Sequence, residues 1–145
     1  MRHDIDPRLI RALLDEQHLA TLATHRKDGS VLLSPLWYVW EDGRFQLGVS
    51  TGDIKLRHVA RDPRVTIVVA EETPPYRGIE VRGIAHVDET NFPTRMRALA
   101  RRYLGPPGDE IYGDDDEGAI ISIEPTATRT WDFDDDLDET NEQVQ

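Results

Sequence analysis

Short strands joined by tight turns dominate this sequence and restrict its fold. Two hairpin signals, Lys27-Asp28-Gly29 and Glu41-Asp42-Gly43, separate stretches rich in Val, Leu, Tyr and Trp. Turns this short join antiparallel neighbours, because parallel strands need a crossover of a dozen or more residues. Apolar runs and alternation predict strands at 19–24, 31–40, 44–49, 65–70, 79–87, 119–123 and 126–133.

Proline restricts where two of these strands can lie. Pro35 sits inside 31–40 and removes a ladder donor, so the strand must have an edge, a bulge or a break there. Glu124-Pro125 predicts a break between the last two strands. The run 65–70 is almost continuously apolar, which is typical of a strand buried on both faces.

Three helices are expected around the strands. The first begins at Pro7 behind an Asp6 cap, and a short second one carries Lys55 and Arg57. The third spans 92–104 and ends at Gly105. The sequence therefore predicts a mainly β fold with α, a six- to seven-stranded antiparallel barrel with three peripheral helices.

The charge of the chain is concentrated in two segments. The 145 residues carry a net charge of −11, but 109–117 and 132–145 contain acids and no bases. Outside these segments 15 acids face 17 bases. We expect one domain over 1–133 and a mobile acidic tail over 134–145, and the acidic segments argue against nucleic acid as a partner.

Two absences in the composition narrow the function classes. The chain has no cysteine, which excludes disulfides and thiolate chemistry. No apolar run approaches the roughly 20 residues of a membrane span, so the chain is expected to be cytoplasmic and to have no membrane partner.

The stretch 49–58 is a candidate anion site. An apolar strand leads through the small residues 50–52 into a helix start with Lys55 and Arg57. Helix N-terminal amides and the helix dipole favour anions at such a place. The alternative is a surface turn with solvated cations. Asp53 would repel a phosphate there unless it caps the helix or pairs with Arg57.

The sequence contains no recognised catalytic or metal motif. Its five histidines lack metal-ligand spacing, and no metal is expected. Trp37, Tyr38 and Trp40 share one predicted strand, where most of them are expected to be core or interface residues. Backbone groups freed by Pro35 are suited to bonding a heterocycle.

Several motifs, in order, resemble one known family. They are Leu19-Ala20-Thr21-Leu22-Ala23-Thr24, Asp28-Gly29-Ser30, Ser34-Pro35-Leu36-Trp37-Tyr38, Val49-Ser50-Thr51, Lys55-Leu56-Arg57-His58, Arg61-Asp62-Pro63-Arg64-Val65 and the run 74–83. Over about residues 5–133 the chain resembles the split-barrel flavin-binding proteins related to pyridoxamine-phosphate oxidase, and more closely the branch that uses the deazaflavin coenzyme F-420. Close relatives bind FMN, and some bind haem or biliverdin.

The resemblance implies a site shared between two subunits of a homodimer. Lys55 and Arg57 would hold the cofactor phosphate, with Ser50 and Thr51 beside it. The ring would lie against Ser34, Pro35, Leu36 and Trp37 through backbone contacts. Tyr76, Arg77 and the nearby Glu80 would close the site or come from the partner chain.

The resemblance also implies an activity. It predicts an oxidoreductase that transfers a hydride between F-420 and a small unsaturated or heteroaromatic substrate. An FMN-dependent oxidoreductase of the same fold is the first alternative, and a non-catalytic flavin- or haem-storage protein is the second. No catalytic acid is required. Tyr38 and Tyr76 are candidates for a proton donor.

Overall fold

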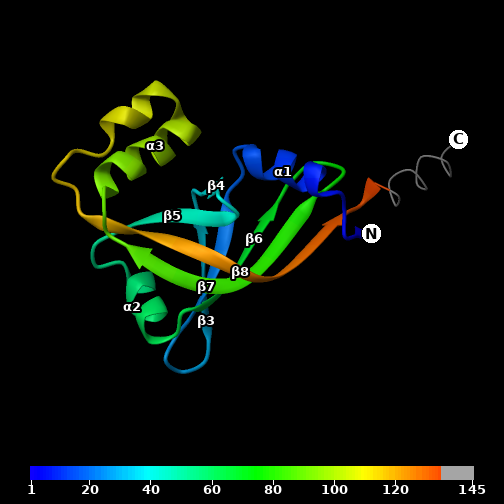
Figure 1. The fold of residues 1–145 in the computed structure, drawn as a ribbon, viewed down its shortest axis with the longest axis horizontal. Helices are drawn as coiled ribbons and strands as arrows, with labels where there is room; N and C mark the ends of the chain where they lie inside the picture. Colours follow the sequence, from blue (N-terminus) through cyan, green and yellow to red (C-terminus); the bar gives the residue numbers. More distant parts are fainter. Residues whose placement is uncertain (135–145) are drawn as a thin grey trace, which may run out of the picture.

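The computed structural model describes residues 1–134, which form one curled antiparallel sheet with helices at its margins (Figure 1). The helices are α1 Pro7–Asp15, α2 Ile54–Arg61, α3 Phe92–Leu104 and the short 3-10 helix η1 Pro106–Glu110. The strands are β1 Arg2–His3, β2 Ala20–His25, β3 Val31–Leu36, β4 Val39–Glu41, β5 Arg44–Ser50, β6 Arg64–Ala70, β7 Gly78–Asp88 and β8 Gly118–Asp132.

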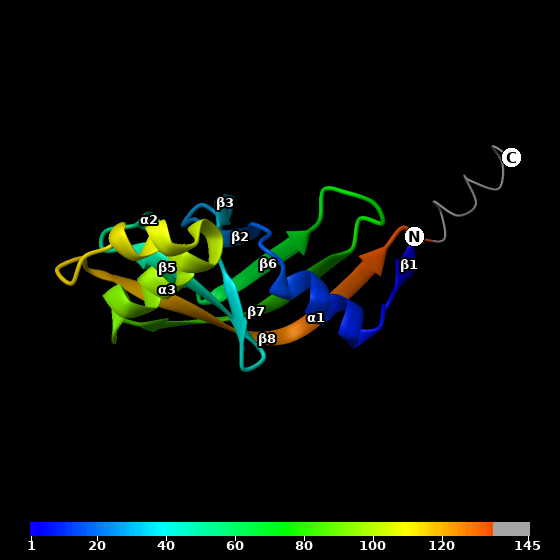
Figure 2. The ribbon, with the colours of Figure 1, turned by 90° about the horizontal axis from the view of Figure 1, so that it is seen from above.

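The sheet has the strand order β3-β2-β6-β7-β8-β5-β4, and β1 adds to β8. β3 and β4 lie at opposite ends of this order, yet only Trp37 and Tyr38 separate them in the chain. Two residues span about 10 Å at most, so the two ends of the sheet must meet there. The sheet therefore curls into the expected barrel, as the two views show (Figures 1 and 2).

The predicted strand 31–40 is two strands. The break falls at Trp37 and Tyr38 and not at Pro35, which stays in β3 opposite Thr21. β3 is an edge strand, and an edge tolerates proline because part of its backbone faces no neighbour. The prediction of an edge was correct, but the position of the break depends on the crossing from β3 to β4.

The two predicted C-terminal strands are one long strand, β8. Its pairing with β7 continues past Pro125, and the irregularity appears as a register shift between Arg82 and Gly83. A Cβ on Gly83 would lie 2.4 Å from the carbonyl oxygen of Glu124. Gly83 therefore allows the two backbones to approach at the bulge, which absorbs the proline without ending the strand.

The helices close the open margins of the sheet. Asp6 caps α1 as predicted, its side chain accepting from the Arg8 amide, and α1 buries Ile10, Leu13 and Leu14. From α3, Arg102 donates to the carbonyls of Leu14, Asp15 and Glu16 at the end of α1, and to that of Tyr38. One arginine thus ties α3, α1 and the β3–β4 link together.

The outer face of β2, β3 and β6 carries exposed apolar side chains. Leu19, Val31 and Leu33 are 54%, 43% and 62% exposed, and Val68 of β6 is half-buried. The expectation that 65–70 is buried on both faces is therefore wrong for the single chain: only Val65, Ile67 and Val69 are in the core. The apolar outer positions are those of a surface suited to a partner.

β1, at Arg2–His3, was not predicted; it pairs with Asp132 and Trp131 of β8. Among residues 1–134, no helix has the length and apolar character needed to cross a membrane. The expected acidic tail lies, apart from Asp134, outside the described residues.

Candidate functional site

The candidate anion site is formed by the turn after β5 and the first residues of α2. Ser50 pairs with Gly118 at the end of β5, and the Thr51 amide donates to the Glu117 carbonyl at 3.1 Å. Gly52 then takes a positive φ of 87°, which a residue with a side chain rarely adopts. Ser50 and Thr51 are exposed beside α2, so they lie where a bound anion would meet them.

Lys55 and Asp53 form a close pair at the start of α2. Asp53 is the N-cap and accepts from the Lys55 amide at 2.9 Å. The Lys55 ammonium lies 3.0 Å from each carboxylate oxygen of Asp53. The Lys55 side chain is only 10% exposed, and burying a charge is unfavourable without such a counter-charge. Asp53 therefore caps the helix, which is one of its two expected roles. Its ionic partner is Lys55 and not Arg57.

Behind this pair, His58 is buried and joined to β2. Its Nδ1 shares a hydrogen bond of 2.9 Å with the Thr24 hydroxyl, and both side chains are almost fully buried. Burial lowers the pKa of His58 below its ordinary value, and cations on and near α2 lower it further. The cations are Arg61, Arg26, Arg57 and Lys55.

These cations are only partly balanced by acids. Asp53 matches Lys55, and Asp62 is held by Arg64 at 2.8 Å. Arg57 is exposed, and within residues 1–134 it makes no ion pair. The start of α2 therefore combines an ammonium, a free guanidinium and helix N-terminal amides with a local surplus of positive charge. This set of donors fits the phosphate of a flavin-type cofactor. Asp53 opposes it at the helix start, and acids also line the cavity beside Thr51: Glu89, Asp114, Asp116 and Glu117.

The residues predicted to hold the ring divide between the two faces of β3. Ser34 pairs with Leu22, and Leu36 with Ala20, so both face the side of β2 on which Thr24 meets α2. Pro35 points to the outer face with Thr21. β3 has no partner on its second edge within the described chain. Its free amides and carbonyls are thus available to a planar ligand.

Trp37 and Tyr38 have packing roles in the link between β3 and β4. The Trp37 ring stacks on Tyr103 of α3, with centroids 5.2 Å apart and planes 7° apart. Tyr38 is fully buried, and its hydroxyl donates to the Leu14 carbonyl at 3.0 Å. Burial also raises the pKa of Tyr38. Its hydroxyl has no access to a substrate, which removes the basis for a role as proton donor.

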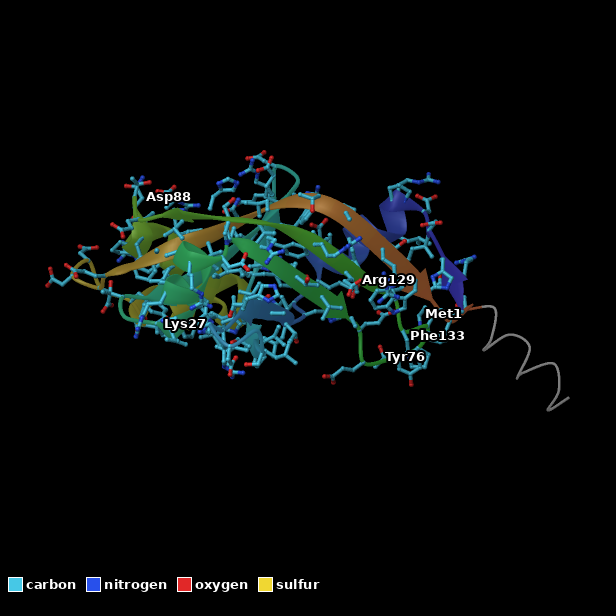
Figure 3. The ribbon with its side chains drawn as sticks, turned by 90° about the horizontal axis from the view of Figure 1, so that it is seen from below. Met1, Lys27, Tyr76, Asp88, Arg129 and Phe133 are labelled. Atoms are coloured by element: carbon cyan, nitrogen blue, oxygen red, sulfur yellow. The ribbon has the colours of Figure 1, made fainter. Side chains whose placement is uncertain are left out.

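Tyr76 and Arg77 lie far from α2 in the same chain. Figure 3 shows Tyr76 with Phe133 and Met1 at one end of the molecule and Lys27 in the opposite half. Lys27 belongs to the β2–β3 hairpin, to which Arg61 of α2 is hydrogen-bonded. Tyr76 is 42% exposed. One chain therefore does not bring Tyr76 and Lys55 together.

Arg77 closes the base of the loop 71–77. It donates to Glu71 at 2.7 Å and to Glu16 at 2.5 Å, and its hydrogen bond to Glu71 lowers the pKa of that carboxyl. His18 joins the two glutamates in a cluster whose ligand atoms lie within 4.8 Å of one another. Arg77 already pairs with both carboxylates, so the cluster is held by ion pairs and Arg77 has no charge left for an anion. Glu80 is paired with Arg129 at 3.1 Å.

A cavity of about 590 Å³ opens on the outer face beside this loop. Pro35 lines it together with Thr21, Val68 and the loop residues Glu72 and Thr73. Its size is in the range of small-molecule sites. It places one predicted ring-binding residue, Pro35, next to the loop that carries Tyr76.

Sequence reasoning missed the buried pairs that support this site. Lys55, His58 and Val59 are the buried residues of α2, and their i, i+3, i+4 spacing was a readable signal of an inward face. Glu71 had no comparable signal, because its partner Arg77 follows after an irregular loop, and Glu16, the second partner of Arg77, lies in a distant part of the chain.

A curled antiparallel sheet with a cationic helix start at its margin defines a split-barrel protein with a candidate anion-binding site. The sequence matches the family described as pyridoxamine 5′-phosphate oxidase over residues 7–132. The chain belongs to this family, as its motifs predicted. A comparison with proteins of curated function gives no match.

Solved structures share the fold. A conserved hypothetical protein of Mycobacterium tuberculosis is 25% identical with a TM-score of 0.73, over 89% of this chain and 86% of that one. An F-420 reductase is 28% identical with a TM-score of 0.72, over 81% of this chain and 94% of its own. The haem storage protein HutZ of Vibrio cholerae is 16% identical with a TM-score of 0.68, over 87% and 94% of the two chains, and shows the fold alone.

Proposed function

We propose that this protein is an oxidoreductase that uses the deazaflavin coenzyme F-420 to reduce a small unsaturated or heteroaromatic substrate. The observation that carries the proposal is the start of α2, where Lys55, Arg57 and helix amides provide donors for a phosphate. The 28% identity to an F-420 reductase supports F-420 over FMN. FMN remains the alternative cofactor, because the same donors suit its phosphate.

In this proposal the residues of the chain bind the cofactor and orient it. Lys55 and Arg57 hold the phosphate, and Ser50 and Thr51 lie beside it. The edge of β3 at Ser34, Pro35 and Leu36, with Trp37 directly after it, receives the ring. Once bound, the deazaflavin supplies hydride chemistry, and the protein positions the substrate and excludes water. Tyr76 is the remaining candidate for a proton donor, since Tyr38 is buried in the core.

We further propose that the working unit is a homodimer whose subunits meet over the apolar outer face of β2, β3 and β6. The exposed Leu19, Val31 and Leu33 support this, as does the distance of Tyr76 from α2 within one chain (Figure 3). Tyr76 of the partner subunit then approaches the site. Light scattering should give twice the chain mass of 16.5 kDa, and a mass of one chain would refute the dimer.

The identity of the cofactor is tested by the colour of the purified protein and by substituting each of its two lysines. The purified protein should be colourless, and titration with F-420 should quench the deazaflavin fluorescence. Lys55→Gln should weaken F-420 binding by about 10- to 100-fold, the loss expected for charge-assisted hydrogen bonds. Lys27→Gln removes the only other lysine, at an exposed turn, and should change nothing.

Other results would select the alternatives. A yellow protein that releases FMN on heating refutes the assignment of F-420, and a haem spectrum together with binding but no turnover favours storage. Equal losses in Lys55→Gln and Lys27→Gln would refute the site itself.

A further inference from the structure

Asp53 occupies two of the donors that a phosphate at α2 would use, the amide and the ammonium of Lys55. One of its oxygens accepts the Lys55 amide at 2.9 Å, and the ammonium of the same lysine lies 3.0 Å from each oxygen. A carboxylate that accepts from a helix amide and from an ammonium has the contacts of a bound anion. The Asp53 carboxylate therefore takes the position at the start of α2 that an external anion would take.

The Lys55–Asp53 pair lies where the charge of a bound ligand has a strong effect. Lys55 is 10% exposed and Asp53 is 26% exposed, so water screens the pair less than it screens a surface ion pair. Arg57 and the other cations near His58 continue to attract an external anion. A ligand phosphate thus meets attraction from these cations and repulsion from Asp53, the negative charge at the helix start.

We propose that Asp53 is a specificity-determining residue that selects a singly charged phosphate diester over a doubly charged phosphate monoester. The inference rests on the proposed function and names the charge class of ligand that the same site takes. The phosphate of F-420 is a diester with one negative charge. The phosphate of FMN is a monoester, and monoesters carry about −1.5 to −2 at neutral pH. Repulsion from Asp53 grows with the charge of the ligand, so it penalises FMN more than F-420.

Asp53→Asn tests this without removing the helix cap, because Asn and Asp cap equally well. The probes share one ring and differ in charge: riboflavin, the cyclic phosphodiester of riboflavin, and FMN. We expect the variant to bind FMN about tenfold and the diester about threefold more tightly, since doubling the charge squares the factor. Affinity for riboflavin should stay unchanged. Flavin fluorescence gives all three dissociation constants without any turnover.

Two further variants test whether the effect comes from the charge at position 53 and not from a loss of the helix cap. Asp53→Ser keeps a capping side chain and should reproduce the Asn result. Asp62→Asn removes the same charge at the other end of α2, where Asp62 is the C-cap, and should change each affinity less than twofold. An equal change for the three ligands, no change, or weaker FMN binding in both Asp53 variants would overturn the role of Asp53.

Lys55→Gln separates this inference from the proposed function. If Lys55→Gln weakens binding of both phosphates while Asp53→Asn has no effect, the phosphate site stands and only the role of Asp53 is refuted. If neither the natural chain nor the Asp53 variants bind any of the flavins or F-420, both proposals are refuted.

Discussion

The buried His58 should make the stability of the protein depend on pH in one direction. Burial and four nearby cations lower the pKa of His58 in the folded state, while the unfolded chain has the ordinary value near 6.5. Below about pH 6.5 the unfolded chain therefore takes up a proton that the folded chain rejects. The folded state therefore has its full stability with respect to His58 at higher pH, and the free energy of unfolding decreases as the pH falls below about 6.5.

The magnitude follows from proton linkage at a single site. The slope is at most about 1.4 kcal/mol per pH unit between the folded and unfolded pKa values. Between pH 7.5 and 5.5 the free energy of unfolding should fall because of His58 by at most about 1.4 kcal/mol, the limit for a folded His58 that takes up no proton in this range. At a typical urea dependence of about 2 kcal/mol per molar, this moves the midpoint by at most roughly 0.7 M.

The measurement compares the natural chain with His58→Gln by urea unfolding at several pH values, followed by the fluorescence of the three tryptophans. Gln does not titrate and is able to bond to Thr24. Carboxylates and the other four histidines contribute to both proteins, so the difference between the two curves reports His58 alone. A difference that is constant with pH, or that favours the natural chain in acid, would refute the reasoning.

Two further predictions concern the core and the bulge. Tyr38→Phe loses the hydrogen bond from the hydroxyl to the Leu14 carbonyl. Urea unfolding should show a free energy of unfolding lower by about 1 kcal/mol, and cofactor affinity should be unchanged. A variant that keeps full stability but loses turnover would instead make Tyr38 the proton donor. Gly83→Ala places a methyl group 2.4 Å from the Glu124 carbonyl and should cost about 2 kcal/mol or more; an unchanged thermal midpoint would show that the backbones of β7 and β8 separate freely at the bulge.

Local signals in the sequence were sufficient for most elements. The hairpin turns, the Asp6 cap with Pro7, and Gly105 at the end of α3 are all where they were predicted. Each depends on the conformation of a few consecutive residues, so neighbouring residue types are enough to read it. The motif order was equally sufficient for the family.

The errors arose where distant segments decide the outcome. Pro125 looks like a strand break, and Pro35 leaves an edge, a bulge or a break open. Both prolines remain in strands: β3 is an edge, and Gly83 of β7 makes room for the bulge opposite Pro125. The fate of a proline depends on what lies across the sheet, and the residues beside it in the chain do not carry that information.

The same division applies to the start of α2. By itself the sequence determined a small-residue turn, a helix and two cations, because these are local properties of residues 49–58. Only the tertiary structure decided that Lys55 turns inward onto Asp53, that Arg57 makes no ion pair within residues 1–134, and that His58 reaches Thr24 of β2. The physical reason is burial: which face of a short helix is removed from water, and which charges must then be paired, depends on the strand against which the helix packs.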